Sequence, residues 1–172
     1  PAISGANLTN LPAGGITEID YWRLTSNFQG NAYHIQNNWS RTDSQLEGKK
    51  GTGMSESSGL FTFPSTGYYY VEFNLTGYRG AGSTVYNITQ YIRTTNSGDT
   101  SSGTLYNLSN NTSMYSESGN SHHTQSARMI VKCSNTSNDK VFFGVQAEQY
   151  IYIQGSSTAN FTYAVFIKLA DI

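Results

Sequence analysis

The side chains of this 172-residue chain with the widest chemical use are three histidines, one cysteine and eleven carboxylates. His122 and His123 adjoin in "GNSHHTQS", and neighbouring strand residues point to opposite faces, so the pair does not predict a shared metal ion. Cys133 falls on the apolar side of "ARMIVKC", which predicts a buried, inert thiol. The carboxylates form no obvious pair along the sequence. We therefore expect a protein that is not an enzyme and that uses no cofactor or metal.

The charge balance excludes two further classes of function. The formal net charge is -1 and charged residues make up only 12% of the chain. A nucleic-acid or anionic-membrane partner would require a basic patch, and the sequence contains none. No apolar run approaches the roughly 20 residues of a membrane-spanning helix. We expect neither nucleic-acid binding nor membrane insertion.

The elements that must position any site are short strands. Residues 1–15 are rich in Gly, Pro and Asn and are predicted to be a linker or the end of a fibre stalk, whereas residues 16–172 form one domain. Good helix formers are sparse, and strand-like runs recur between turn residues. The pattern predicts an all-β antiparallel sandwich, a jelly roll. The expected strands are 16–26, a short one at Trp39, 60–63, 68–76, 83–95, 104–108, 127–133 and three runs that end at 146, 154 and 169.

Several of these strands are apolar on both faces. In "GLFTFPSTGYYYVEF", residues 59–73, alternation places Tyr69, Val71 and Phe73 on one face, which we expect to be the core. The opposite face also carries tyrosines, and the runs near the C-terminus repeat this two-faced pattern. An apolar face that one sandwich core cannot cover indicates a subunit interface. The predicted interface residues are Tyr68, Tyr70, Phe142 and Phe166.

The same stretch resembles the signature of the trimeric heads of complement component one, subcomponent q, which are related to tumour necrosis factor. Five positions match that signature, and Val71 stands where the family has its middle Phe. "NDKVFFGVQ" and the C-terminal "NFTYAVFIKL" are similar to later strands of the family, and the resemblance spans about residues 16–170. It implies a ten-stranded jelly roll that assembles as a homotrimer. The matching positions are Phe61, Pro64, Gly67, Tyr69 and Phe73.

A second resemblance points to a source. "WRLTSNF", "NNWSRTD" and "FIKLADI" resemble the C-termini of marine bacteriophage structural proteins, and "ISGANLTNLPAG" resembles the repeats of phage fibre stalks. This implies a fibre head on the virion surface, with a host glycan or protein as its receptor and other virion proteins bound through the N-terminal segment. Three alternatives stay open: a capsid decoration protein without a receptor, a secreted extracellular binding module with the complement-head fold, and an enzyme that acts on glycans.

Two predicted loops carry residues suited to receptor contact. Residues 77–82 include Tyr78 and Arg79, and residues 109–123 include Tyr115, His122 and His123. Aromatic faces stack on sugar rings, and arginine donates hydrogen bonds to hydroxyls or carboxylates. The simpler interpretation is that both segments are solvated loops without a ligand.

Overall fold

The computed structural model describes residues 15–42, 48–79, 87–100, 106–112, 121–147 and 150–172, with only the backbone for 106–112 and 121. None of these residues is helical. They form twelve strands, several of only two or three residues. The strands are β1 (Ile19–Leu24), β2 (Phe28–Gln29), β3 (Trp39–Arg41), β4 (Ser55–Ser57), β5 (Leu60–Thr62), β6 (Gly67–Arg79), β7 (Ile88–Thr95), β8 (Tyr106–Thr112), β9 (Ser121–Cys133), β10 (Lys140–Ala147), β11 (Ile151–Ile153) and β12 (Tyr163–Ala170).

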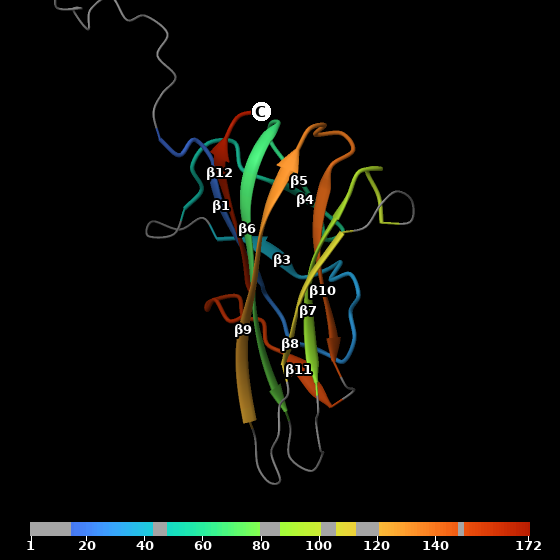
Figure 1. Cartoon of the computed structure of the whole chain (residues 1–172). Coiled ribbons are helices and arrows are strands. Elements are labelled where there is room, and N and C mark those ends of the chain that lie inside the picture. Colours follow the sequence, from blue (N-terminus) through green and yellow to red (C-terminus); the bar gives the residue numbers. More distant parts are fainter. Residues whose placement is uncertain (1–14, 43–47, 80–86, 101–105, 113–120, 148–149) are drawn as a thin grey trace, which may run out of the picture.

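The strands lie in two antiparallel sheets. The seven-stranded sheet has the order β2–β11–β6–β12–β1–β3, and β9 pairs with the remaining edge of β6. The five-stranded sheet has the order β4–β5–β10–β7–β8. The two sheets pack against each other, and the C-terminus lies at the same end of the molecule as the first described residues (Figure 1). The predicted antiparallel sandwich is confirmed.

Strand β6 is the centre of the seven-stranded sheet. One of its edges pairs with β9 along its whole length, and the other pairs first with β12 and then with β11. Tyr69, Val71 and Phe73 are buried, so the predicted core face of this strand is confirmed. The strand continues to Arg79 and β9 begins at Ser121. Both strands are longer than the sequence predicted, because each supplies the other with backbone hydrogen-bond partners.

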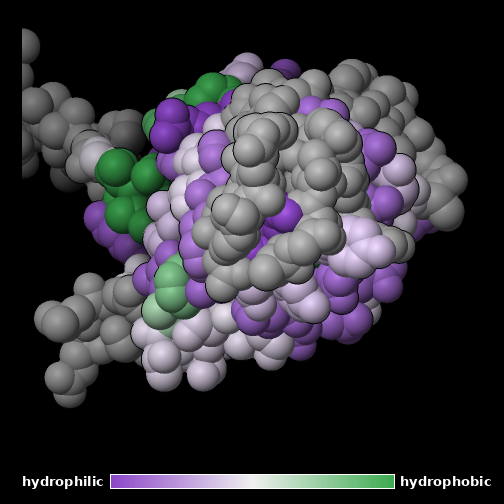
Figure 2. Space-filling view, turned by 90° about the horizontal axis from the view of Figure 1, so that it is seen from below, coloured by the Kyte–Doolittle hydropathy of each residue, from purple (hydrophilic) through white to green (hydrophobic). Residues whose placement is uncertain are grey.

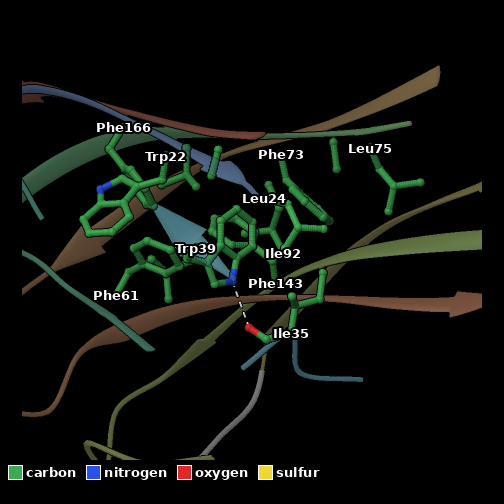
Figure 3. Packing of buried hydrophobic residues seen from close by; sticks show 14 of the residues in the cluster. Trp22, Leu24, Ile35, Trp39, Phe61, Phe73, Leu75, Ile92, Phe143 and Phe166 are labelled. Carbon is green, nitrogen blue, oxygen red and sulfur yellow. Dashed lines mark hydrogen bonds between the residues drawn. The ribbon is translucent and has the colours of Figure 1, made fainter. Parts of the chain in front are cut away.

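The core between the sheets is a cluster of aromatic rings (Figure 3). Phe143 of β10 lies 4.8 Å from Phe73 of β6 and 5.5 Å from Trp39 of β3, measured between ring centroids. Phe166 of β12 joins the same cluster, 5.2 Å from Phe61 of β5. The Trp39 indole donates a hydrogen bond of 2.9 Å to the Ile35 carbonyl, which satisfies its one polar atom.

A buried carboxylate, Asp20, holds β1 against the rest of the sandwich. Asp20 accepts hydrogen bonds from the Trp22 indole at 2.8 Å, from the Met54 backbone N–H at 2.7 Å and from Arg41 Nε at 2.8 Å. A buried charge is tolerated only when it is paired and hydrogen-bonded in this way. Because neighbouring residues of a strand face opposite ways, holding Asp20 inside turns Ile19 and Tyr21 outwards.

Candidate functional site

The outer face of the seven-stranded sheet, called the open face below, carries a row of apolar side chains. Strand register aligns Ile130 of β9 with Tyr70 of β6, then Ile167 of β12 and Ile19 of β1. Ile130 is 53% exposed, and the other three are half-buried. These four residues are the apolar row. An outer sheet face of a sandwich is normally polar, so a continuous apolar row indicates a surface that a partner covers.

The adjacent row on the open face holds an ion pair. Arg128 lies 3.4 Å from Glu72, and the Tyr70 hydroxyl donates a hydrogen bond of 2.7 Å to the same carboxylate. Burial raises the pKa of Glu72, but the hydrogen bonds from Tyr70 and Arg128 and the charge of Arg128 outweigh burial and lower the pKa overall. Burial and the neighbouring Glu72 raise the pKa of Tyr70. Glu72 is therefore ionised and Tyr70 neutral at pH 7.

At the end of the open face away from the C-terminus lies a stack of three rings. Tyr78 of β6 pairs in register with His122 of β9 and Tyr152 of β11. The Tyr78 ring is 5.5 Å from His122 at an interplanar angle of 26°, and 5.0 Å from Tyr152 at 12°. These three residues are the aromatic ladder. His122 is exposed and the tyrosines are half-buried, so ring edges reach solvent there.

The predicted receptor residues are only partly brought together. Tyr78 and His122 meet in the aromatic ladder, but in strands, so the prediction that they lie in loops was wrong. Arg79 points to the opposite face and is 2% exposed, so it is not available to a receptor. His123 is on the inward side of β9, opposite Gly77. Tyr115 and residues 80–82 lie outside the described residues.

Of the four predicted interface residues, two lie on the open face and two are buried within the subunit. Tyr68 and Tyr70 lie on the open face, and Tyr68 is 37% exposed. Phe166 is 2% exposed and packs in the core, because the alternation of β12 turns Val165 and Ile167 outwards instead. Phe142 is 1% exposed and is covered by the chain itself. A residue buried within one subunit cannot contact another, so the prediction was wrong for Phe142 and Phe166.

The cover over Phe142 comes from the segment between β2 and β3. Its backbone pairs with the free edge of β10, where Ala32 and Val145 exchange hydrogen bonds of 2.9 and 2.7 Å. The His34 ring then lies 4.9 Å from the Phe142 ring. Burial lowers the pKa of His34, and the positive charge of Arg93 acts in the same direction. His34 is therefore neutral at pH 7, and its ring covers the Phe142 ring.

The described residues offer little catalytic chemistry. They include no group of three or more His, Cys, Asp or Glu side chains that could hold a metal ion. Cys133 is fully buried, and burial together with the Asp139 carboxylate raises the pKa of its thiol to about 11, so it is a poor nucleophile. Among the described residues, no helix has the length and apolarity to span a membrane.

The two sheets and their strand order define the antiparallel jelly-roll sandwich of the tumour-necrosis-factor type. No protein-family model and no curated protein matches the sequence. The structure of murine APRIL at pH 5.0 is similar, with a TM-score of 0.61 and 13% identity over 88% of this chain and 98% of that chain. The Eiger TNF from S. frugiperda is also similar, with a TM-score of 0.58 and 15% identity over 90% of this chain and 93% of that chain. At these identities the likeness shows the fold alone, and it confirms the predicted jelly roll.

Proposed function

We propose that this chain is the non-enzymatic, trimeric head of a virion fibre, which assembles through the open face and attaches the particle to a host surface. The observation that carries the proposal is the exposed apolar row, and above all Ile130, which is more than half exposed in the single subunit. Monomeric proteins rarely leave such a continuous apolar surface in water. A second copy of the same chain is the simplest partner, because it is present wherever the protein is.

Three copies rather than two are favoured by the sequence. The stretch that builds β5 and β6 resembles the signature of trimeric complement-type heads, and the fold is that of the tumour-necrosis-factor type. The uneven surface fits such an arrangement: strongly hydrophobic residues gather toward one side of the molecule, and most of the remaining described surface is polar (Figure 2). A trimer that shields this side would leave the polar flanks in solvent.

The assignment to a virion rests on the sequence resemblance to phage structural proteins and fibre stalks. The position of the first described residues fits a head that is attached to a stalk at one end. The described chain begins next to the C-terminus, with Gly15 near Leu169 and Asp171, at one end of the sandwich (Figure 1). A stalk that precedes Gly15 would join the head at that end. The aromatic ladder and the flanks then remain accessible to a host cell. The same resemblance argues against a catalytic role, which the described residues do not support.

Light scattering after size-exclusion chromatography tests the assembly. We expect a mass of about three times the 18.9 kDa of one chain. Ile130→Glu places a charge in the apolar row and should give monomers, because burying an unpaired carboxylate at an interface is costly. Ser57→Glu adds the same charge at an exposed position of β4 and should remain trimeric. A monomeric parent protein at micromolar concentration would contradict the proposal.

Adsorption tests the attachment role separately. Fluorescently labelled trimer is mixed with a panel of marine bacterial isolates, and retention on washed cells is measured against a heat-unfolded sample. We expect saturable retention on some strains. A stable trimer that is retained by none of the strains would favour a decoration role in the virion over host attachment.

A further inference from the structure

A patch of aromatic and arginine side chains lies on the outer face of the five-stranded sheet, apart from the open face. Ile92 of β7 is buried in the core, so alternation turns its neighbours Tyr91 and Arg93 to the outside. Tyr33 comes from the segment between β2 and β3 that pairs with the edge of β10, and Gln146 comes from β10 itself. These four residues, Tyr33, Tyr91, Arg93 and Gln146, are the Tyr–Arg patch.

The Arg93 guanidinium is held in place by the other members of the patch. Its Cζ lies 4.5 Å from the centre of the Tyr91 ring and 5.6 Å from the centre of the Tyr33 ring. Arg93 Nη1 donates a hydrogen bond of 3.2 Å to the Tyr33 carbonyl. The Tyr91 hydroxyl donates a hydrogen bond of 3.0 Å to Gln146 Oε1, which fixes the Tyr91 ring. A side chain that is ordered in advance loses less conformational entropy when it binds a ligand.

The positive charge of Arg93 has no anionic partner. No carboxylate among the described residues forms an ion pair with it. Glu56 instead accepts a hydrogen bond of 2.6 Å from the Gly59 N–H. Arg93 Nη2 has no hydrogen-bond partner among the described residues and, unlike Nε, is not buried. A stacked guanidinium with N–H donors that reach solvent is suited to a carboxylate.

The patch also offers an aromatic surface and an amide. Tyr33 is 52% exposed although its ring is large and mostly apolar. A tyrosine ring supplies flat contact area at a low cost in conformational entropy, and the C–H face of a sugar ring packs on such a surface. Gln146 is exposed, and its amide nitrogen is a donor for a hydroxyl group. A ligand that complements the patch has an anionic group, hydroxyl groups and an apolar face.

We propose that the Tyr–Arg patch binds an acidic oligosaccharide, with a sugar carboxylate at Arg93 and a sugar ring against Tyr33. An acidic protein is the poorer match, because protein interfaces typically bury about 800 Å² per partner and the patch consists of four side chains. Phosphate alone would leave the exposed Tyr33 ring without a partner. The patch lies on the sheet that the proposed trimer leaves outside. The inference deepens the proposed function, on which it rests for the source of the ligand, a host envelope polysaccharide.

Calorimetric titration of the full chain tests the proposal with a galacturonic acid trisaccharide and the uncharged galactose trisaccharide as probes. We expect the acidic trisaccharide to bind roughly tenfold or more tightly than the neutral one, and added salt to weaken its binding. Arg93→Gln should reduce the affinity for the acidic trisaccharide by a similar factor, because a charge-assisted hydrogen bond is lost. Lys50→Ala removes the same charge at an exposed position beside β1, in the other sheet, and should bind like the parent.

Because Arg93 also bonds to the Tyr33 carbonyl, two further variants separate binding from folding. Tyr33→Ala should weaken binding of the acidic trisaccharide roughly three- to tenfold, while the melting temperature stays within about 2 °C of the parent, as for other exposed positions. Tyr33→Phe keeps the ring and should bind like the parent. Equal affinity for the uncharged trisaccharide, for triglutamate or for inorganic phosphate would overturn the assignment to an acidic sugar. So would undiminished affinity in either the Arg93→Gln or the Tyr33→Ala variant.

The two proposals fail in different measurements. A parent protein that binds the acidic trisaccharide but has a monomer mass in light scattering overturns the trimeric head and leaves the assignment of the patch intact. A trimer that adsorbs to cells but does not bind the acidic trisaccharide overturns the assignment of the patch and leaves the head intact. Tyr33 and Arg93 lie outside the open face, so the mass of their variants should equal that of the parent.

Discussion

The outer faces of the two sheets both carry apolar residues, but they differ in how these residues are covered. On the five-stranded sheet, the segment between β2 and β3 pairs with the free edge of β10 and places His34 on Phe142. This outer face, called the closed face below, is therefore covered within the subunit. On the seven-stranded sheet, the described residues provide no such cover, and Ile130 and Tyr68 remain exposed. One apolar face is thus covered by the chain itself, whereas the other stays partly exposed in the single subunit.

The difference shows that an apolar outer face is not by itself an interface. Phe142 and Tyr70 look alike in sequence, since each is an aromatic residue facing away from the core in a two-faced strand. What separates them is a distant segment with the polar sequence "GNAYHIQNN", residues 30–38. Close approach is part of this cover: a Cβ added to Gly144 of β10 would meet the Tyr33 carbonyl oxygen. The following predictions test the contrast between the closed and the open face.

The largest effect is expected on the closed face. Phe142→Ala should lower the free energy of unfolding by about 3–5 kcal/mol, as for other buried phenylalanines, because the cavity under His34 cannot collapse fully. Tyr68→Ala, on the open face, should cost far less. Both changes are made in the Ile130→Glu background, so that assembly does not contribute, and measured by urea unfolding. Equal losses for the two variants would show that the faces do not differ.

The second prediction concerns the open face. Folding that is linked to assembly becomes more stable as the protein concentration rises. For the parent trimer we expect the melting temperature to rise by roughly 2–4 °C for each tenfold increase in concentration. Ile130→Glu should abolish this dependence, whereas Phe142→Ala should lower the melting temperature and keep the dependence. A parent melting temperature that is independent of concentration would argue against an interface on the open face.

The sequence predicted the core of the fold well because alternation is a local signal. Tyr69, Val71 and Phe73 are buried as expected, and Ala127, Val131 and Cys133 of β9 face inwards as their spacing predicted. The fold class followed from the same short periodic runs. Phe166 was placed on the wrong face because β12 is apolar on both sides, and periodicity does not then tell the inner face from the outer one.

The candidate site was only partly predictable, because it depends on contacts between distant strands. Gly77 and residues 121–123 were predicted to lie in loops, yet β6 and β9 pair continuously from Gly67 to Arg79 and from Ser121 to Cys133. A strand at Tyr152 was predicted, but its register with β6, which brings Tyr152 beside Tyr78, could not be read from the sequence.

The third prediction uses pH to probe the closed face. The folded-state pKa of His34 lies below its value of about 6.5 in the unfolded chain. The unfolded state therefore binds more protons near pH 6.5 and below, so this contribution to stability is complete above that pH and is lost as the pH falls. His34→Gln should reduce the loss of stability between pH 7.5 and 5.5, measured by urea unfolding. The charges of Arg93 and Glu56 also act on His34, in opposite directions. If the change of stability with pH is the same in the His34→Gln variant as in the parent, His34 is not buried in its neutral form.

The smallest effect is expected at the aromatic ladder. Cross-strand pairs of this kind contribute roughly 0.2–1 kcal/mol, so Tyr78→Leu and His122→Ala should each reduce stability only slightly. A double-mutant cycle should give a coupling of the same size. The ladder lies at the end of the open face away from the C-terminus, so adsorption of the same variants tests whether that end contacts a host cell. If attachment uses another surface, the Tyr78→Leu, His122→Ala protein adsorbs to cells like the parent. Loss of adsorption in the ladder variant, with its fold and mass unchanged, would instead assign receptor contact to Tyr78 and His122.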